Sequence, residues 1–382
     1  MIERRLRILI VLGTSTGGIG RHVRSLAAGL VERGHQVVVA GPSDTETLFA
    51  FTAAGARFVE AEIGVTPSPR DLAVARMLSH WVKGADVVHA HGFRAGLVAL
   101  TAGAGKGLPV AGVRAQDVPL VVSWHNQVLA SGLRGRVMHG VEGIVARGAS
   151  LSLGASADLV AQATAAGGSA ELGEVAAPTP GPASHDREEV RKSLGVEDEP
   201  MVLAVGRLHP QKDYPTLVSA MKLLGHRNPR PLLVVAGDGP DEQALSQLIA
   251  QEKVAARLLG RRDDVADLLH AADVLALSSV WEARALVVQE AMQVGLPVVA
   301  TSVGGLPELV GSDGLLVPPG DPAAVAQAIE AVLDDPAGAA ARAERAKRRA
   351  DAWPTEDDVV DQVVGVYRRL GTPPGNEKGH PA

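Results

Sequence analysis

The 382-residue chain contains no cysteine, which excludes disulfide bridges, a thiol nucleophile and a thiolate metal site. Phe, Trp and Tyr make up only 3% of the residues, too few for the base-stacking platforms of single-strand nucleic-acid binders. Positive charge is not in excess either, because 37 Lys and Arg stand against 43 Asp and Glu, for a net charge of −6. This balance argues against a protein whose whole surface binds nucleic acid.

Long apolar runs are also missing, and none reaches the 18 or more residues of a membrane-spanning helix. The basic start of the chain precedes Ile8–Leu12, which is too short for the core of a secretory signal and is followed by glycine. We therefore expect Ile8–Leu12 to be a first β-strand and the protein to be cytoplasmic.

What the chain does have is a regular alternation of strand-like and helix-like segments. Hydrophobic residues amount to 46%, and the length suits two domains of about 150 residues each. Such alternation predicts parallel sheets covered by helices on both faces, the doubly wound α/β class that binds nucleotides. The expected strands are 8–12, 37–40, 87–88, 121–123, 202–205, 232–236, 257–259, 274–277, 298–300 and 315–317.

Two segments set the expected domain boundaries. Prolines bracket a charged stretch at 178–200, which predicts a linker. A helix is expected at 356–370, and the Pro- and Gly-rich tail after it is expected to be disordered. The predicted division is 1–180 for the first domain, 181–353 for the second, and 354–382 for the last helix and the tail.

The first loop with chemical potential is Gly13–Gly20. It lacks the Gly-Lys-Ser/Thr ending of a P-loop, and Val23 stands where a dinucleotide fingerprint needs glycine or alanine. The adjacent Gly17 and Gly18 at a helix start would still let backbone N–H groups approach a phosphate or a sugar. A plain strand–helix turn is the alternative.

Histidines end two of the expected strands. His89 and His91 are spaced like a metal pair, but no third ligand is evident, so no metal site is predicted. His125 follows the next strand, where ligands meet sheets of this class. A buried structural histidine is the alternative at that position.

The loop Gly206–Asp213 carries two cations. Arg207 and Lys212 flank the start of a helix that Asp213 can cap, and a helix start already favours anions. Two cations and a helix start fit a diphosphate, although solvated surface charges are the alternative. The later loop Gly260–Asp263, with Arg261, could present backbone atoms to a base.

Two glutamates stand eight residues apart near the end of the second domain. Glu282 lies in a loop and Glu290 within the following apolar helix, about 12 Å away if the intervening chain is helical. That is too far for the paired carboxylates of a retaining glycosidase, which lie about 5–5.5 Å apart. The spacing favours two contacts along one elongated ligand. A structural salt bridge is the alternative for Glu290, because a buried carboxylate needs a partner.

Together these residues resemble the retaining glycosyltransferases of family 4, which have the GT-B fold, over nearly the whole chain to about residue 370. The resemblance implies two Rossmann-like domains facing a cleft, with a C-terminal helix crossing back to the first. The stretches that carry it are Thr16–Gly20, Asp86–Gly92, Gly206–Leu208 with Lys212, Val235–Pro240, and Glu282 to Met292 followed by Gly295–Thr301.

The resemblance also implies the reaction, namely retaining transfer of a hexose from a UDP- or GDP-sugar to a hydroxyl acceptor. The acceptor would be a small molecule, a glycan or a lipid-linked sugar, and neither a cofactor nor a metal would be needed. The sequence also contains no Asp-x-Asp pair, the motif that would hold a metal at a strand end.

Individual roles follow from the same resemblance. Gly17 and Gly18 would approach the donor phosphates, and Arg207 and Lys212 would hold the diphosphate. Glu282 would hold the hexose, Glu290 the ribose hydroxyls, and His125 would lie on the acceptor side. The expected catalytic residues are His125, Arg207, Lys212 and Glu282, and the donor-binding residues are Gly17, Gly18, Arg207, Lys212, Arg261, Glu282, Arg284 and Glu290.

One stretch departs from the family pattern. Ala283-Arg284-Ala285 stands where the family commonly has Gly-Phe-Gly, which restricts backbone approach to the donor and adds a cation near the expected diphosphate. This motivates a second hypothesis, a relative that binds a nucleotide sugar without transferring it. An NAD-dependent oxidoreductase is a third, weakened by the missing glycine.

A further segment, Leu129–Ala149, carries Arg134, Arg136, His139 and Arg147 among apolar residues. A basic amphipathic helix of this kind would allow weak peripheral membrane contact. A solvated helix face is the alternative. No nucleic-acid partner is expected.

Overall fold

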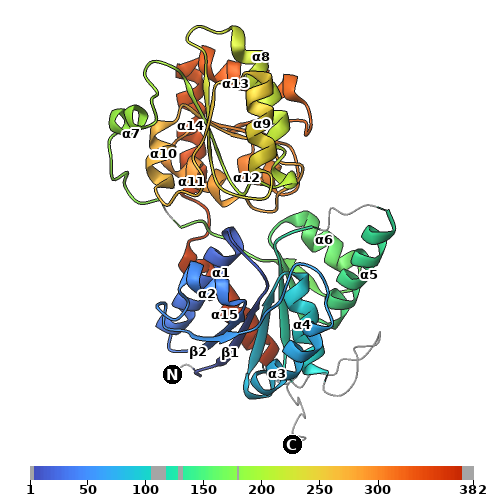
Figure 1. Cartoon of the computed structure of the whole chain (residues 1–382). Helices are drawn as coiled ribbons and strands as arrows, with labels where there is room; N and C mark the ends of the chain where they lie inside the picture. The colour runs from blue at the N-terminus through green and yellow to red at the C-terminus, as the bar shows by residue number, and fades with distance from the viewer. Residues whose placement is uncertain (1–3, 105–117, 128–131, 179, 372–382) are drawn as a thin grey trace, which may run out of the picture. The chain divides into compact units, whose positions relative to one another are not determined.

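The computed structural model describes residues 4–104, 118–127, 132–178 and 180–371. They belong to two compact units (Figure 1). The first unit contains the chain up to Val175 and again from Pro354, and the second contains Ala176–Trp353. Each unit is built on its own parallel sheet.

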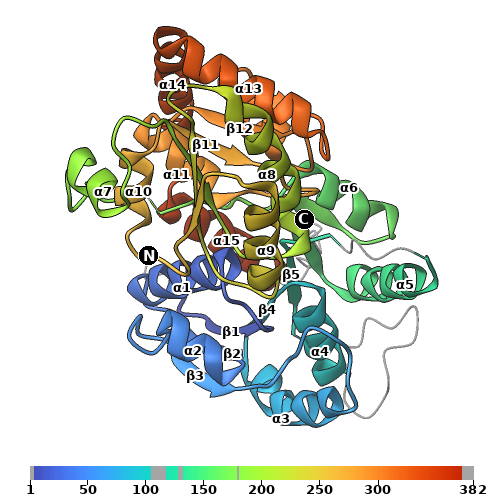
Figure 2. The ribbon, with the colours of Figure 1, turned by 45° about the horizontal axis from the view of Figure 1, so that its top comes forward.

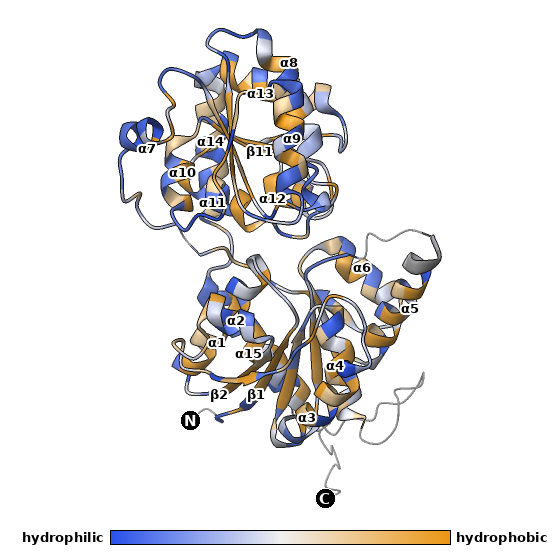
Figure 3. Ribbon diagram, in the orientation of Figure 1, coloured by the Kyte–Doolittle hydropathy of each residue, from blue (hydrophilic) through white to orange (hydrophobic). Residues whose placement is uncertain are grey.

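The sheet of the first unit has the strand order β3-β2-β1-β4-β5-β6-β7, and all of its paired strands are parallel. Its central strands are buried along their length, which explains their continuous apolar sequences (Figure 3). The strands are β1 (Arg7–Leu12), β2 (Gln36–Gly41), β3 (Arg57–Glu60), β4 (Val87–His91), β5 (Leu120–Trp124), β6 (Leu151–Gly154) and β7 (Ala170–Leu172).

Helices cover both faces of this sheet. On one face lie α1 (Gly18–Glu32), α2 (Ser43–Phe49) and α15 (Glu356–Gly371), and on the other lie α3 (Arg70–Gly84), α4 (Phe93–Gly103), α5 (Gly132–Gly148) and α6 (Ala157–Ala165) (Figure 1). Helix α15 therefore returns to the first unit after the chain has built the second. The fit is close, because a Cβ on Gly29 of α1 would lie 2.6 Å from a methyl group of Val360.

The sheet of the second unit is also parallel, with the order β10-β9-β8-β11-β12-β13. Its central strands β8 and β11 are neighbours, so the loops that follow them lie side by side at one edge. The strands are β8 (Met201–Val205), β9 (Leu232–Ala236), β10 (Ala256–Leu258), β11 (Val274–Leu277), β12 (Val298–Thr301) and β13 (Leu315–Val317).

Two apolar cores flank this second sheet, one on each face. One core is covered by α7 (Arg187–Ser193), α10 (Val265–Ala271), α11 (Leu286–Val294), α12 (Leu306–Val310) and α14 (Pro336–Ala350). The other is covered by α8 (Tyr214–Leu223), α9 (Glu242–Glu252) and α13 (Pro322–Asp334) (Figure 2). Two short 3₁₀ turns, Pro210–Lys212 and Leu224–His226, precede and follow α8.

The structure corrects one prediction about chain organisation. The stretch 178–200, expected to be a linker, contains helix α7, which belongs to the second unit. Asp186 caps this helix by accepting from the Glu189 N–H at 2.7 Å, and Val190 is buried in the core. The units divide after Val175, five residues before the predicted boundary. The tail 372–382, expected to be disordered, lies outside the described residues.

Candidate functional site

Three loops of the second unit meet at the carboxyl edge of its sheet through their backbones. The Gly237 N–H donates to the Gly260 carbonyl at 2.8 Å, and the Gly206 N–H donates to the Ala236 carbonyl at 3.0 Å. A Cβ on Gly237 would lie 2.0 Å from the Gly206 carbonyl oxygen, so only glycine fits there. The backbones of three glycines, Gly206, Gly237 and Gly260, therefore meet at the edge where sheets of this class bind ligands.

The two predicted charged residues of this edge are in contact. The Lys212 Nζ lies 2.5 Å from the Glu282 Oε1. Their side chains are only 19% and 10% exposed, so the pair is largely shielded from solvent. Asp213 caps α8 as expected, accepting from the Thr216 N–H at 3.4 Å and also from the Thr216 hydroxyl at 2.6 Å. Lys212 therefore lies in the turn before the helix.

Buried hydroxyl groups fix the loop that carries Glu282. Ser279, which is fully buried, donates to the Glu282 Oε1 at 2.7 Å, and the Thr301 hydroxyl donates to the Ser279 carbonyl at 2.6 Å. Gly304, with φ of +52°, lets the turn after β12 pass close to this loop, because a Cβ there would lie 1.9 Å from the Glu282 carbonyl oxygen. The Glu282 carboxylate is therefore held in place independently of Lys212.

Tyr214 adds a polar group beneath the same loops. Its hydroxyl donates to the Gly206 carbonyl at 3.0 Å. Burial, together with the nearby Glu282 charge, raises the pKa of the Tyr214 hydroxyl above its usual value. Tyr214 is consequently a neutral donor that supports the glycine turn.

The remaining predicted donor-binding residues lie in different surroundings. Arg207 and Arg261 are exposed, and neither forms an ion pair or side-chain hydrogen bond with any residue that the structure describes. Glu290 is buried within α11. The Arg284 guanidinium carbon lies 5.8 Å from the centre of the Trp353 ring, at the end of the second unit. The loop Ala283–Ala285 thus has its two alanines buried and its arginine over an indole.

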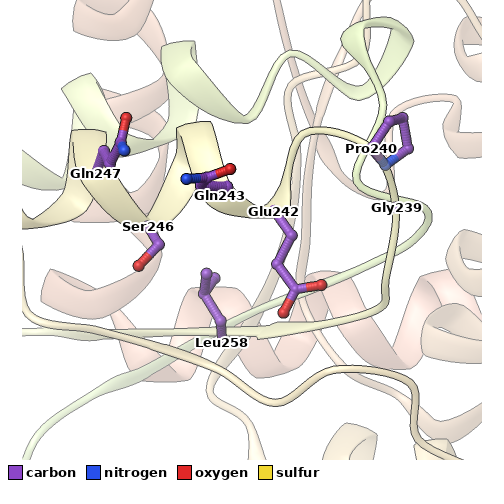
Figure 4. Close-up of a pocket in the computed structure, with 7 residues that line it drawn as sticks. All are labelled: Gly239, Pro240, Glu242, Gln243, Ser246, Gln247 and Leu258. Carbon is purple, nitrogen blue, oxygen red and sulfur yellow. The ribbon is translucent and has the colours of Figure 1, made fainter.

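An open groove beside α9 is a second concave feature of this unit (Figure 4). Its described lining is Gly239, Pro240, Glu242, Gln243, Ser246, Gln247 and Leu258. This lining contains one carboxylate and no cation, so the groove does not suit a diphosphate.

The glycine loop of the first unit begins α1. Gly17 is the residue before the helix, with φ of −144°, and Gly18 is its first residue. The first turn of α1, all of which is described, holds no acidic side chain. A Cβ on Gly17 would meet nothing within 4 Å, whereas one on Gly20 would lie 2.0 Å from the Phe49 ring. Packing therefore explains Gly20 but not Gly17.

Four histidines of the first unit, His22, His89, His91 and His125, form a cluster that the sequence did not reveal. His91 Nδ1 and His125 Nε2 lie 3.0 Å apart, and His22 of α1 packs edge-on against both rings. Behind them, His89 contacts the Tyr367 hydroxyl of α15 at 2.7 Å and the Ser123 hydroxyl at 2.8 Å.

Burial keeps all four imidazoles of this cluster neutral. It lowers the pKa of His22 to about 4 and that of His89 to about 3. The pKa values of His91 and His125 lie well below the usual range, first because of burial and then because the other imidazoles are close. His125 is therefore an uncharged polar group at this edge.

Helix α5 corresponds to the basic segment that we considered for membrane contact, although residues 128–131 lie outside the described part. His139 contacts the buried Glu142 at 2.8 Å, and Arg147 donates to the Ala166 carbonyl at 2.9 Å. Two of its four basic groups are thus engaged within the protein. No helix among the described residues is long and apolar enough to cross a bilayer.

Two doubly wound units with glycine-rich loops at their sheet edges define an α/β protein of the nucleotide-binding class. Comparison with family models then identifies the family. Residues 17–179 match the glycosyl transferase 4-like domain, and residues 186–351 match glycosyl transferases group 1. The chain belongs to the group 1 glycosyltransferases and has their GT-B fold.

Similar proteins agree with this membership. Glycogen synthase of Mycobacterium tuberculosis is 29% identical over 92% of both chains. D-inositol 3-phosphate glycosyltransferase of Corynebacterium urealyticum is 36% identical over 51% of this chain and 50% of its own. Among solved structures, HepE of Anabaena in complex with UDP-glucose superposes with a TM-score of 0.80 at 21% identity, over 96% of this chain and 100% of its own.

Proposed function

We propose that this glycosyltransferase moves a hexose from a UDP- or GDP-sugar to a hydroxyl acceptor, with retention and without a metal at the diphosphate. The observation that carries the proposal is the contact between Lys212 and Glu282 at the glycine-lined edge of the second sheet. It joins a cation suited to a diphosphate and a carboxylate suited to sugar hydroxyls. HepE, which shares the fold, is described in complex with UDP and glucose.

Donor binding would rearrange this pair. Cleavage of the sugar–phosphate bond leaves negative charge on the diphosphate, and fixed positive groups stabilise such charge in the transition state. Lys212 would turn from Glu282 to the diphosphate, with the exposed Arg207 as the second cation. Glu282, still held by Ser279, would then be free to accept from a hexose hydroxyl.

Glu290 and Arg261 would contact the nucleoside end of the donor. Glu290 is buried in α11, eight residues beyond Glu282, and would accept from the ribose hydroxyls. Arg261 is exposed in the loop after β10, whose Gly260 carbonyl already accepts from Gly237. Arg284 would complete the donor contacts only after leaving Trp353, so we expect it to contribute least.

The first unit would supply uncharged groups. Gly17 has open space around its Cα and a helix start behind it, so backbone N–H groups could approach a donor phosphate. His125 would lie on the acceptor side as a neutral imidazole, oriented by His91. With retention, a donor phosphate oxygen would accept the proton of the acceptor hydroxyl on the same face.

The second candidate is a relative that binds nucleotide sugars without transferring them. One observation favours it, namely that Ala283 and Ala285 are buried beside Glu282, where family members commonly have glycines. A methyl group at each position limits the approach of a donor to this backbone. Catalysis, rather than binding, is what separates the two candidates.

The test is a panel of UDP- and GDP-sugars screened by thermal shift, followed by transfer assays with each sugar that binds. We expect at least one donor to raise the melting temperature and to be turned over, with an unchanged anomeric configuration by NMR. Binding with neither transfer nor hydrolysis would favour the second candidate. Inversion of the anomeric centre would contradict the proposed mechanism.

A further inference from the structure

Three histidines from separate elements bring their ring nitrogens together in the first unit. His22 comes from α1, His91 ends β4, and His125 follows β5. One nitrogen from each ring lies within 4.8 Å of the others. His22 and His91 are buried and His125 is partly buried, so the cluster is an interior feature rather than a chance surface grouping.

The hydrogen bonds within the cluster leave His91 incompletely paired. His91 Nδ1 and His125 Nε2 are 3.0 Å apart and share one hydrogen. His91 Nδ1, the atom that would bind the metal, thus shares its hydrogen only with another imidazole, while His91 Nε2 on the other side of the ring is buried without a hydrogen-bond partner among the residues that the structure describes. The neighbouring His89, by contrast, uses both ring nitrogens, on Tyr367 and Ser123. His89 is therefore a support for the cluster and not a free ligand.

We propose that His22, His91 and His125 form a binding site for a divalent transition-metal ion, with Zn²⁺ the best match. Zn²⁺ takes imidazole nitrogens at about 2.0–2.1 Å in tetrahedral sites, which places those nitrogens about 3.3 Å apart. The His91–His125 separation of 3.0 Å is already close to this value. A movement of the His22 ring would bring its nitrogen to the same distance from the other two, since all three nitrogens already lie within 4.8 Å of one another.

A small cavity beside the histidines suits a fourth ligand, and the three imidazoles decide which kind of metal can bind. A cavity of about 10 Å³, lined by His22, His125, Ser123 and Glu174 among others but not by His91, has room for about one water molecule. Three imidazoles and one water form a recognised zinc coordination set. Ca²⁺ and Mg²⁺ prefer oxygen ligands, so a set of three neutral imidazoles selects against them.

All three histidines belong to the first unit, whereas Lys212 and Glu282 belong to the second. The sequence indicated only His89 and His91 as a metal pair, with no third ligand. The structure shows instead that His91 lies with His22 and His125, while His89 pairs with Tyr367 and Ser123. The proposal adds a metal site without giving the metal a part in sugar transfer.

The test uses the full chain, stripped of metal by a chelator that is then removed, and titrated with CoCl₂ and ZnCl₂. We expect one Co²⁺ per chain with the intense visible absorption of tetrahedral cobalt, and loss of that absorption when Zn²⁺ displaces it. Calorimetry should give one Zn²⁺ per chain. Absence of the tetrahedral cobalt spectrum at stoichiometric Co²⁺ would overturn the proposal.

Variants assign the ligands. His22→Asn, His91→Gln and His125→Asn should each lower Zn²⁺ affinity by about 10- to 100-fold or more, since even losing a group that supports a ligand costs that much. His80→Gln and His226→Gln are the controls, because both histidines are exposed and lie outside the cluster. Circular dichroism in chelator checks the fold of each variant. Wild-type Zn²⁺ affinity in any two folded cluster variants would contradict the proposal, and using three variants keeps the test valid if one does not fold.

Discussion

The two units build the same kind of parallel sheet but place opposite chemistry at its carboxyl edge. In the second unit, Lys212 and Glu282 form an ion pair, and the exposed Arg207 adds another cation. In the first unit, the corresponding loops hold buried neutral histidines and a glycine loop. Side chains on the loops, rather than the shared sheet, therefore decide what each edge can bind.

Burial explains how the two edges stay different. The Lys212–Glu282 pair is shielded from solvent, but each side chain has the other as its ionic partner, and Ser279 adds a hydrogen bond to Glu282. The four clustered histidines of the first unit pack against one another, and desolvation lowers their pKa values. Binding of a nucleoside diphosphate should therefore depend on the charged edge of the second unit far more than on the neutral edge of the first unit.

The largest expected effect comes from removing the cation of the charged edge. Lys212→Ala should lower kcat by about 10²–10³-fold, the usual loss for one group that stabilises developing negative charge. Ser279 still holds Glu282 in the variant, so the fold should persist. Steady-state kinetics and a melting curve measure both. The control is Lys222→Ala in α8, where the lysine is 58% exposed and pairs with Glu252. Equal rates in the two variants would show that Lys212 has no part in transfer.

A somewhat smaller effect is expected at the nucleoside end of the donor. Glu290→Gln should weaken binding of UDP or GDP by about 10- to 150-fold, because a hydrogen bond to a charged group is worth about 1.5–3 kcal/mol. Calorimetric titration provides the measurement. Glu330→Gln is the matched control, since Glu330 pairs with Arg227 at 3.0 Å in α13. If both variants bind the nucleotide like wild type, Glu290 has a structural role only.

The glycine loop of the first unit offers a prediction that separates packing from ligand approach. The added Cβ of Gly17→Ala would meet no atom within 4 Å, so the melting temperature of this variant should stay close to that of the wild type. Its kcat/KM should fall by about tenfold or more, because the methyl group would hold the donor away from the loop. Gly20→Ala should instead lose stability, by about 1–3 kcal/mol, because its Cβ would clash with Phe49. Thermal melting and kinetics on the pair distinguish the two cases. An active Gly17→Ala enzyme would remove this loop from the proposed donor contacts.

The smallest expected effect is that of metal removal on transfer. The charged edge supplies its own cations and the sequence has no Asp-x-Asp pair, so turnover should be the same with and without excess EDTA. The same treatment would empty the proposed histidine site, so unchanged turnover would also show that a metal at this site is not needed for transfer. Loss of turnover in EDTA that Mn²⁺ restores would contradict the proposed metal-independent mechanism.

Much of the fold could be predicted from the sequence, because buried parallel strands leave a clear apolar signal. The strands Leu232–Ala236, Val274–Leu277 and Leu315–Val317 were predicted at their observed bounds. Strands β3 and β7 were missed because they are short and only partly buried, and β6 was missed because Ser152 and Gly154 interrupt its buried leucines. The charged residues of α7 concealed a helix that is anchored by Val190 and by contacts of Arg187 with Asp273.

The candidate site was predicted in part, for a physical reason. Residues that follow strands, such as Lys212, Glu282 and His125, could be placed at the sheet edges from the topology alone. The contact between Lys212 and Glu282 could not, because 70 residues separate them and the turn geometry of both loops decides it. His22 was missed because a helix histidine gives no local signal that it faces two strand ends. Arg284 was placed near the diphosphate by proximity to Glu282, whereas the structure sets it over Trp353.

The most direct test of the charged edge is calorimetric titration of Glu282→Gln with UDP and GDP, alongside a transfer assay. Glu282 pairs with the Lys212 ammonium before the donor binds. A neutral glutamine at position 282 should therefore leave the affinity for UDP and GDP unchanged or raise it. Sugar transfer should fall sharply in the same variant, because the contact with the hexose is lost. A loss of nucleotide affinity equal to that of Glu290→Gln would contradict this division of roles and show that Glu282 only holds the local structure together.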